Sequence, residues 1–325
     1  MRSLTRRLGV LAAAAALTVT AAACSSPQAS NTSATASSGS GTSPAASARP
    51  AFPVSIAAAN GKVKVASRPA AILSLSPTAT EMLYAIGAGS QVKAVDSLSD
   101  YPPQAPRTKV SAYQPNVEAI VAEKPDLVVE SGDTGQLTKR LAAFSIPVLE
   151  LPAPSNLAGE IYEFDELGQA TGHVNQAHKE AYRVGTQLHQ IAAAAPHHTK
   201  LTYYYELDQT FYSVTSSTFV GQLLALIGMK SIADQASGAA RSGGYPQLSA
   251  EYIIKANPDY IILADTLCCH QDAATVAKRP GWSGLAAVKA GHIIGLNDDI
   301  ASRWGPRVTD LLRTVETAVA KGGGG

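Results

Sequence analysis

Residues 116–129 read Asn-Val-Glu-Ala-Ile-Val-Ala-Glu-Lys-Pro-Asp-Leu-Val-Val, and residues 249–262 repeat the plan as Ser-Ala-Glu-Tyr-Ile-Ile-Lys-Ala-Asn-Pro-Asp-Tyr-Ile-Ile. Each stretch opens with a good helix N-cap, places apolar residues on one helical face, and ends in Pro-Asp before a short apolar run. This pattern predicts a helix, a turn and a buried strand. A second pair of related segments, 81–87 and 222–228, occurs in the same order. Two such pairs indicate a duplicated, domain-sized unit.

Short apolar runs alternate with helical patterns through both copies of this unit. Residues 71–75 are one such run, and the Ser-Pro-Thr that follows leads into a helix, with Thr78 and Glu81 spaced as a capping box. Strands that alternate with helices are typical of a parallel sheet covered on both faces. We therefore predict an α/β protein with two lobes, 66–155 and 199–320, each built on a central, mostly parallel sheet flanked by helices.

The segment 156–196 connects the two predicted lobes. In its second part, apolar residues from Val174 to Ile191 recur with helical spacing. They predict one long backbone helix of roughly 33 Å, long enough to run along both lobes. A single helical connection of this kind predicts lobes that move little relative to one another.

The N-terminus has the features of an export signal. Three arginines precede an apolar run, Leu8 to Ala23, that is too short to span a bilayer and ends in small residues before Cys24. Residues 1–23 are therefore predicted to be a signal peptide. Cys24 stands where bacterial lipoproteins carry their acylated cysteine, and simple secretion is the alternative. Residues 24–60, rich in Ser, Thr, Ala, Gly and Pro, are predicted to be a flexible tether.

Composition excludes several classes of partner. The formal net charge is +1, and the export signal alone contains three arginines, so no basic field favours nucleic acid. No apolar run after Cys24 is long enough to cross a membrane. At 46% apolar residues, the remaining chain can build two proper cores.

Three further stretches, together with the two helix-Pro-Asp-strand units, carry a resemblance to a known family. They read Leu-Ser-Pro-Thr-Ala-Thr-Glu at 75–81, Ser-Asp-Tyr-Pro-Pro-Gln-Ala at 99–105, and Asp-Ile-Ala-Ser-Arg at 299–303. Over about residues 66–318 the chain resembles the cobalamin and iron-siderophore substrate-binding proteins of ABC importers, the class III periplasmic binding proteins with a helical backbone.

The resemblance implies an extracytoplasmic, lipid-anchored, monomeric receptor. Such a receptor captures a bulky metal chelate, cobalamin or a ferric siderophore, between its lobes and delivers it to the subunits of an ABC permease. It needs no cofactor and no metal of its own. Two alternatives are a haem-binding receptor and a surface lipoprotein that senses a ligand or binds a partner protein without transport.

The resemblance also implies a ligand site in the loops that follow the strands. Tyr113 and Tyr245 stand where cobalamin binders place tryptophans. The alternative for any one tyrosine is an ordinary half-buried aromatic residue, and Asp299 with Arg303 is also spaced as a helical ion pair. The implied ligand-binding residues are Ser76, Pro77, Thr78, Tyr101, Tyr113, Tyr212, Tyr245, Asp299 and Arg303.

Glu118 and Glu251 occupy equivalent positions in the repeat, each two residues after an N-cap. An acid in the first helical turn complements the helix dipole. The resemblance implies a second role, in which each glutamate docks onto an arginine of the permease. An exposed acid at a helix start serves either role.

Cys268-Cys269-His270 follows a predicted strand and suggests three hypotheses: a vicinal disulfide, a pair of free thiols, or a metal ligand set. Export to an oxidising space favours the disulfide. The loop from Ser76 to Glu81 contains no histidine, which disfavours the related zinc and manganese receptors.

Catalysis is not expected from this sequence. The Ser-Pro-Thr loop at 76–78 is no Gly-x-Ser-x-Gly elbow, and neither a partnered histidine nor a phosphate-cradling glycine loop is evident. We predict a binding protein and no enzyme.

Overall fold

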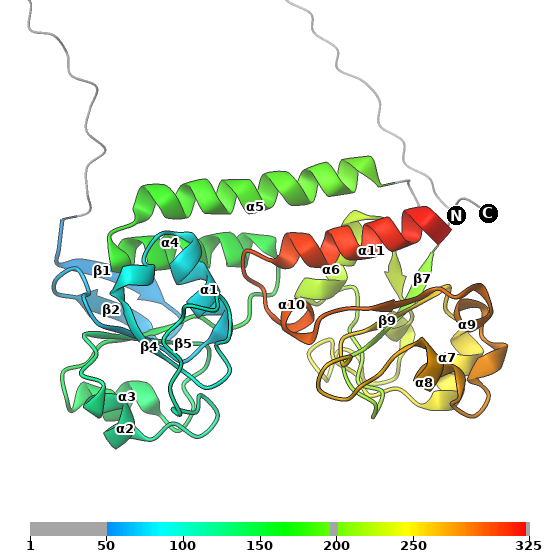
Figure 1. The fold of residues 1–325 in the computed structure, drawn as a ribbon, viewed down its shortest axis with the longest axis horizontal. Coiled ribbons are helices and arrows are strands. Elements are labelled where there is room, and N and C mark those ends of the chain that lie inside the picture. Colours follow the sequence, from blue (N-terminus) through cyan, green and yellow to red (C-terminus); the bar gives the residue numbers. More distant parts are fainter. Residues whose placement is uncertain (1–50, 196–200, 323–325) are drawn as a thin grey trace, which may run out of the picture. The chain divides into compact units, whose positions relative to one another are not determined.

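The computed structural model describes residues 51–195 and 201–322, and Figure 1 shows their fold. The predicted signal peptide 1–23, Cys24 and most of the predicted tether lie outside the described residues. We call the part built around the first parallel sheet the N-terminal lobe, and the part built around the second parallel sheet the C-terminal lobe. Among the described residues, no helix has the length and apolar character that a membrane span requires.

The N-terminal lobe contains a four-stranded parallel sheet with the order β4-β3-β5-β6. All residues of β3 and β5 are buried, as expected of central strands covered on both faces. The sheet is flanked by helices α1 to α3. Its strands and helices are β3 (Ile72–Ser74), α1 (Pro77–Ala85), β4 (Val92–Val95), α2 (Val117–Ala122), β5 (Leu127–Glu130), α3 (Leu137–Ala142) and β6 (Val148–Glu150), with a 3₁₀ turn at Gly89–Gln91.

The C-terminal lobe repeats this plan with a parallel sheet in the order β10-β9-β7-β8. Its elements are β7 (Thr202–Glu206), α6 (Phe219–Leu226), β8 (Lys230–Ser231), α7 (Ala250–Ala256), β9 (Tyr260–Leu263), α8 (Ala273–Ala277), α9 (Ala286–Ala290), β10 (Ile293–Gly295), α10 (Asp298–Ser302) and α11 (Val308–Gly322), with 3₁₀ turns at Ile232–Gln235 and Trp282–Gly284. The predicted fold class, two helix-flanked parallel sheets, is confirmed.

The sequence repeat is also a structural repeat. Helix α2 is followed by the buried strand β5, and helix α7 is followed by the buried strand β9. The caps match as well, because Asn116 accepts a hydrogen bond from the Ala119 amide and Ser249 accepts one from the Tyr252 amide. Both copies therefore aim the loop after their strand toward the carboxyl edge of a sheet.

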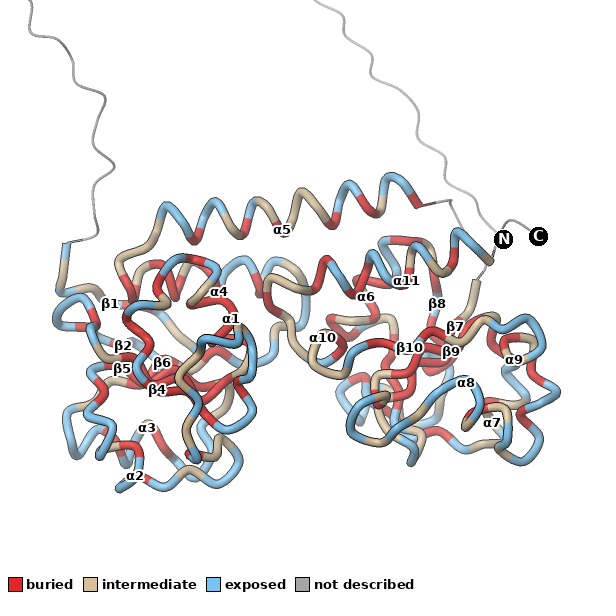
Figure 2. Tube along the Cα trace, viewed as in Figure 1, coloured by how far each residue is buried: buried red, intermediate tan, exposed pale blue. Residues whose placement is uncertain are grey.

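Two helices, α4 (Leu157–Thr171) and α5 (Val174–Ala194), connect the lobes. Gly172, with φ 76°, ends α4 in the left-handed conformation that glycine favours. Helix α5 packs against α4 and also against α11 of the C-terminal lobe (Figure 1). Its buried residues follow one stripe, visible as alternating colours in Figure 2. The predicted helix from Val174 onward is therefore present and contacts elements of both halves.

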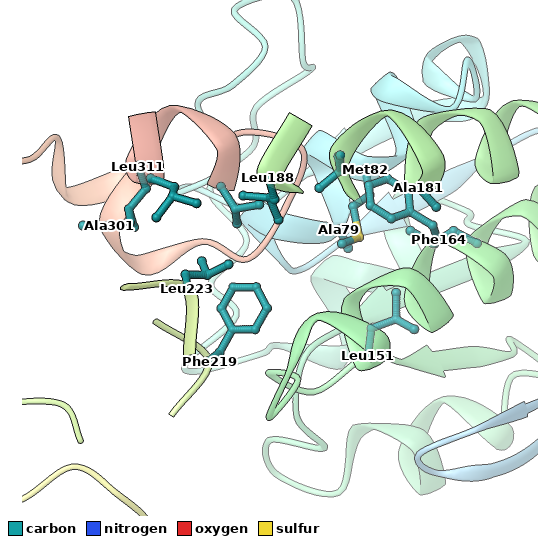
Figure 3. Packing of buried hydrophobic residues seen from close by; sticks show 14 of the residues in the cluster. Ala79, Met82, Leu151, Phe164, Ala181, Leu188, Phe219, Leu223, Ala301 and Leu311 are labelled. Atoms are coloured by element: carbon teal, nitrogen blue, oxygen red, sulfur yellow. The ribbon is translucent and has the colours of Figure 1, made fainter. Parts of the chain in front are cut away.

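One hydrophobic cluster extends through both lobes and the connecting helices. Figure 3 shows Ala181 of α5 beside Met82 and Phe164, and Leu188 of the same helix beside Leu311 of α11. Two smaller clusters fill the other faces of the two sheets. Because the lobes share one core, separating them would expose apolar surface to water. This exposure costs about 25 cal/mol of free energy per Å².

Residues 54–65 correct one prediction. They form an antiparallel hairpin of β1 (Val54–Ala58) and β2 (Gly61–Val65), although 24–60 was predicted to be a tether. The missed signal is the Asn-Gly pair at 60–61 between alternating apolar residues: Ala59 and Asn60 form the turn, and Gly61 begins β2. Gly61 has φ 102°, and Tyr162 of α4 donates a hydrogen bond to the Ala57 carbonyl. The hairpin thus packs onto the connecting helix.

Helix α4 places three glutamates in the interior. Glu160, Glu163 and Glu166 are each less than 5% exposed, and both carboxylate oxygens of Glu160 lack a hydrogen-bond partner among the described residues. Burial, with smaller contributions from neighbouring acids, raises the pKa of Glu160 well above its usual value and that of Glu166 to about 7. Burial also raises the pKa of Glu163 to about 8, although its hydrogen bond from Trp304 opposes the shift. Neutral carboxyl groups are therefore part of this interior at pH 7.

We expect the free energy of unfolding to decrease more steeply with pH in the natural protein than in Glu163→Gln. Folded Glu163 keeps its proton up to pH about 8, whereas the unfolded chain loses it near 4.5, so stability is lost as pH rises between these values. The slope from one such group is at most about 1.4 kcal/mol per pH unit. Urea denaturation between pH 5.5 and 7.5, roughly the window these pKa values define, measures it. Equal slopes in the two proteins would contradict the assignment.

Candidate functional site

A cleft of about 410 Å³ lies where loops after the strands of both sheets meet. The carboxyl ends of parallel strands are where ligands bind in folds of this type. Its lining residues are Ser76, Pro77, Thr78, Ser97, Leu98, Asp100, Arg107, Tyr113 and Ser131 from the N-terminal lobe, with Asp299, Ser302, Arg303 and Trp304 from the C-terminal lobe. The structure therefore brings together six of the nine predicted ligand-binding residues.

The loop after β3 shapes one wall of the cleft. Ser76 caps α1 by accepting a hydrogen bond of 3.2 Å from the Ala79 amide, and Pro77 occupies the first helical turn. The predicted capping box of Thr78 and Glu81 is therefore wrong. Glu81 is displaced from that role because its buried carboxylate pairs with arginines of the C-terminal lobe.

Hydroxyl groups beneath this wall connect the strand ends. Thr80 donates a hydrogen bond to Ser74 or Ser99, whose hydroxyl oxygens lie 2.9 and 3.0 Å away, and the Ser99 hydroxyl in turn donates to Asp96. Burial raises the pKa of Asp96, against the lowering effect of its bond from Ser99. This buried polar network links α1 to the loop that follows β4.

Arg303 is the most highly bonded residue of the cleft. Its guanidinium donates to Glu81 (3.1 Å), Asp100 (2.9 Å), Asp299 (2.6 Å) and the Leu98 carbonyl (3.1 Å). The predicted ion pair with Asp299 is present, but three of the four acceptors belong to the N-terminal lobe. Arg303 therefore joins the two lobes.

Glu81 binds a second arginine of the C-terminal lobe. The Arg307 Nε donates to Glu81 Oε2 at 2.7 Å, and a further Arg307 nitrogen donates to Oε1. The Glu81 side chain is 1% exposed and that of Arg303 is 9% exposed. We call Glu81, Arg303 and Arg307 the interlobe clamp. It is not apparent from the sequence, because Glu81 lies far from both arginines along the chain.

The pKa values of the two acids beside Arg303 shift in opposite directions. Burial tends to raise the pKa of Asp100, but the hydrogen bond and the charge of Arg303 outweigh it, so the pKa is lowered. Burial raises the pKa of Asp299 despite the nearby arginines. The carboxyl group of Asp100 is therefore protonated only at lower pH than usual, whereas that of Asp299 is protonated at higher pH than usual.

The four predicted tyrosines occupy different surroundings. Tyr113 lines the cleft and is 78% exposed, and Tyr245 lines a smaller cavity beside it. Tyr101 faces another surface pocket, where the Arg307 guanidinium lies 4.1 Å from its ring centroid. Tyr212 is half-exposed, and its backbone pairs with Gln247. The structure thus places Tyr113 in the cleft and Tyr245 at its border.

Several cleft residues were not predicted from the sequence. The residues that complete the lining are Ser97, Leu98, Asp100, Arg107, Ser131, Ser302 and Trp304. Trp304 directly follows Arg303, and its indole Nε1 donates to Glu163 at 2.9 Å. A search of every position just after a predicted strand would have included Ser97 and Ser131, since strand ends define this edge of the sheets.

Glu118 and Glu251 lie in equivalent first turns of α2 and α7, and both are exposed. Hydrogen bonds from its own backbone amide and from Ser249 lower the pKa of Glu251. The two acids are thus available at the surface as charged groups that complement their helix dipoles.

Cys268 and Cys269 are free thiols in the structure, which corresponds to one of the three hypotheses for this pair. The turn is held by its backbone instead, because the Cys268 amide donates to Asp298 and the Cys269 amide donates to the Asp265 carbonyl. A hydrogen bond with Cys269, together with burial and Asp298, raises the pKa of Cys268 to about 12. Residues 51–195 and 201–322 contain no group of three His, Cys, Asp or Glu placed to hold a metal ion.

Comparison with known proteins agrees with this architecture. The periplasmic binding protein family matches residues 72–300, and this chain belongs to that family. The matched region begins at β3 and ends within α10, so it includes both parallel sheets and most of the cleft.

Two relatives cover most of the chain. The uncharacterized ABC transporter substrate-binding lipoprotein YvrC of Bacillus subtilis is 29% identical over 279 residues, which are 82% of this chain and 86% of the relative. The vitamin B12-binding protein of Pectobacterium atrosepticum is 31% identical over 250 residues, which are 74% of this chain and 85% of the relative.

A solved structure shows the same fold. It is a possible iron-binding, periplasmic solute-binding protein from Staphylococcus epidermidis, with a TM-score of 0.68 and 26% identity. The similarity covers 78% of this chain and 99% of that chain. The two-lobed arrangement is therefore shared over nearly the whole length of that protein.

We expect Glu81→Ala to lower the free energy of unfolding by about 3–5 kcal/mol, because Arg307 loses its carboxylate partner and Arg303 loses the most deeply buried of its three. Asp100→Ala is the matched control, since its side chain is 40% exposed and such ion pairs contribute about 1 kcal/mol or less. Urea denaturation of both variants measures the difference. A loss no larger for Glu81→Ala than for Asp100→Ala would show that the interlobe clamp contributes little.

Proposed function

We propose that this protein is the extracytoplasmic substrate-binding lipoprotein of an ABC importer, and that it captures a bulky metal chelate in the cleft. The observation that carries the proposal is the cleft itself, in which strand-end loops of both sheets face one shared space. The family match and the names of the two relatives support the same role. Acylation of Cys24 would anchor the monomer to the membrane through its tether.

The chemistry of the cleft favours binding over catalysis. The carboxylates of Asp100 and Asp299 and the guanidinium of Arg303 are engaged with one another. No cleft residue pairs a nucleophile with a histidine base, which nucleophilic catalysis requires. We propose that the ligand leaves this protein chemically unchanged.

Among chelates, the cleft supports cobalamin best. Tyr113 offers a broad aromatic face to a macrocycle, and polar groups of the opposite wall suit carboxamide side chains. The vitamin B12-binding relative supports this choice. A ferric siderophore and haem are the alternatives.

Titration of the purified protein with cyanocobalamin, haemin and a ferric hydroxamate tests the ligand. We expect cobalamin to bind most tightly and Tyr113→Ala to weaken it about tenfold, since burying an aromatic contact contributes roughly 1–1.5 kcal/mol. Tyr182→Ala is the matched control, because Tyr182 is 77% exposed and lies on α5. Binding of none of the three chelates would overturn the ligand class, and tighter binding of haemin would favour the haem receptor.

We further propose that Glu118 and Glu251 dock onto the permease, one from each lobe. In a reconstituted importer, Glu118→Lys and Glu251→Lys should reduce ligand uptake severalfold, because charge complementarity governs orientation and encounter. Ligand affinity of the free protein should not change. Glu123→Lys is the matched control, because Glu123 is exposed at the other end of α2. Uptake that is equal in all three variants would exclude this docking mode.

A further inference from the structure

A second, smaller cavity of about 180 Å³ adjoins the cleft. Its walls are mostly aliphatic and aromatic carbon, with Phe219 and Leu223 from α6, Ala301 from α10, and Val308 and Leu311 from α11. Figure 3 shows four of these residues gathered at the C-terminal end of the shared core. We call this space the side cavity.

The side cavity and the cleft share a border. Ser302, Arg303 and Trp304 line both spaces. Trp304 is held in place because its indole nitrogen donates to the buried Glu163. The border is therefore an edge that both spaces share, with an aromatic ring in it, and a molecule in the cleft lies next to the side cavity.

Protein interiors are packed to nearly crystalline density, and voids of this size are few. An engineered apolar cavity of roughly 150 Å³ in another protein stays dry and binds benzene. The side cavity is of similar size and similar lining, so a small aromatic molecule fits it. Its one charged neighbour, Arg303, already has its acceptors, so nothing in the lining compensates an added charge.

We propose that the side cavity is a subsite that receives an uncharged aromatic or branched aliphatic group of the molecule bound in the cleft. This inference rests on the proposed function, because it assumes a ligand in the cleft. It deepens that function by requiring a ligand with two parts. A polar body faces the serines and charged groups of the cleft, and an apolar group of about ten heavy atoms or fewer enters the side cavity.

The two tryptophans of the chain allow a direct test, since Trp304 borders the side cavity and Trp282 is buried in the separate cluster beneath β7 and β9. The purified protein labelled with 5-fluorotryptophan is titrated with benzimidazole, toluene and benzoate. We expect saturable movement of the Trp304 fluorine resonance with the two neutral probes, no movement of the Trp282 resonance, and binding of benzoate at least tenfold weaker. No saturable response of Trp304 would overturn the subsite.

Variants that fill the space locate the binding. Val220→Phe places an aromatic ring into the side cavity from α6. Leu226→Phe is the control, because Leu226 is 45% exposed on the same helix and does not line the cavity. Ala153→Phe blocks the side cavity from its exposed border. It keeps the test decisive if Val220→Phe does not fold. Val220→Phe and Ala153→Phe should lose probe binding at least tenfold. Unchanged probe binding in both folded variants would overturn the proposal.

A competition experiment separates this inference from the proposed function. If a chelate binds the cleft through this subsite, saturating benzimidazole should raise its apparent Kd severalfold, and Val220→Phe should weaken it similarly. If the probes bind but do not compete with a bound chelate, the side cavity is no part of the ligand site and the inference fails while the function stands. If the probes bind and no chelate does, the proposed function fails and the link between side cavity and ligand fails with it.

Discussion

One buried carboxylate, that of Glu81, connects the two lobes at the cleft. It accepts hydrogen bonds from Arg303 and Arg307, and its side chain is almost fully buried. A buried ion pair adds little net stability compared with apolar packing, because desolvating the charges is costly. Its effect is on geometry, because two arginines of the C-terminal lobe must lie beside one carboxylate of the N-terminal lobe. The cleft therefore has a defined width before any ligand enters.

The shared core acts in the same direction as the interlobe clamp. Helix α5 buries one stripe against α4 and against α11, so apolar surface as well as charge opposes separation of the lobes. A receptor with such a preformed cleft avoids much of the ordering cost that a closing hinge incurs on binding. This arrangement suits recognition of a rigid, bulky molecule by shape.

Local patterns predicted most of the fold and only part of the site. The repeated helix, turn and strand, and the stripe on α5, depend on periodicity within single segments, which the sequence displays directly. The partners of Glu81 lie more than two hundred positions away, and nothing in the spacing of Thr78 and Glu81 distinguishes a capping acid from an interlobe one. The hairpin β1–β2 was missed for another reason, because its short strands follow a low-complexity segment and were assigned to it.

The two copies of the repeat diverge where they face each other. Their caps and exposed first-turn acids are alike, with Asn116 and Glu118 matched by Ser249 and Glu251. The walls of the cleft are not alike, since the N-terminal lobe supplies serines and Tyr113, whereas the C-terminal lobe supplies Asp299, Arg303 and Trp304 and borders the apolar side cavity. An asymmetric cleft recognises an asymmetric molecule. Polar groups on both walls, with an apolar side cavity beside one of them, therefore favour a chelate with chemically distinct faces over a symmetric one.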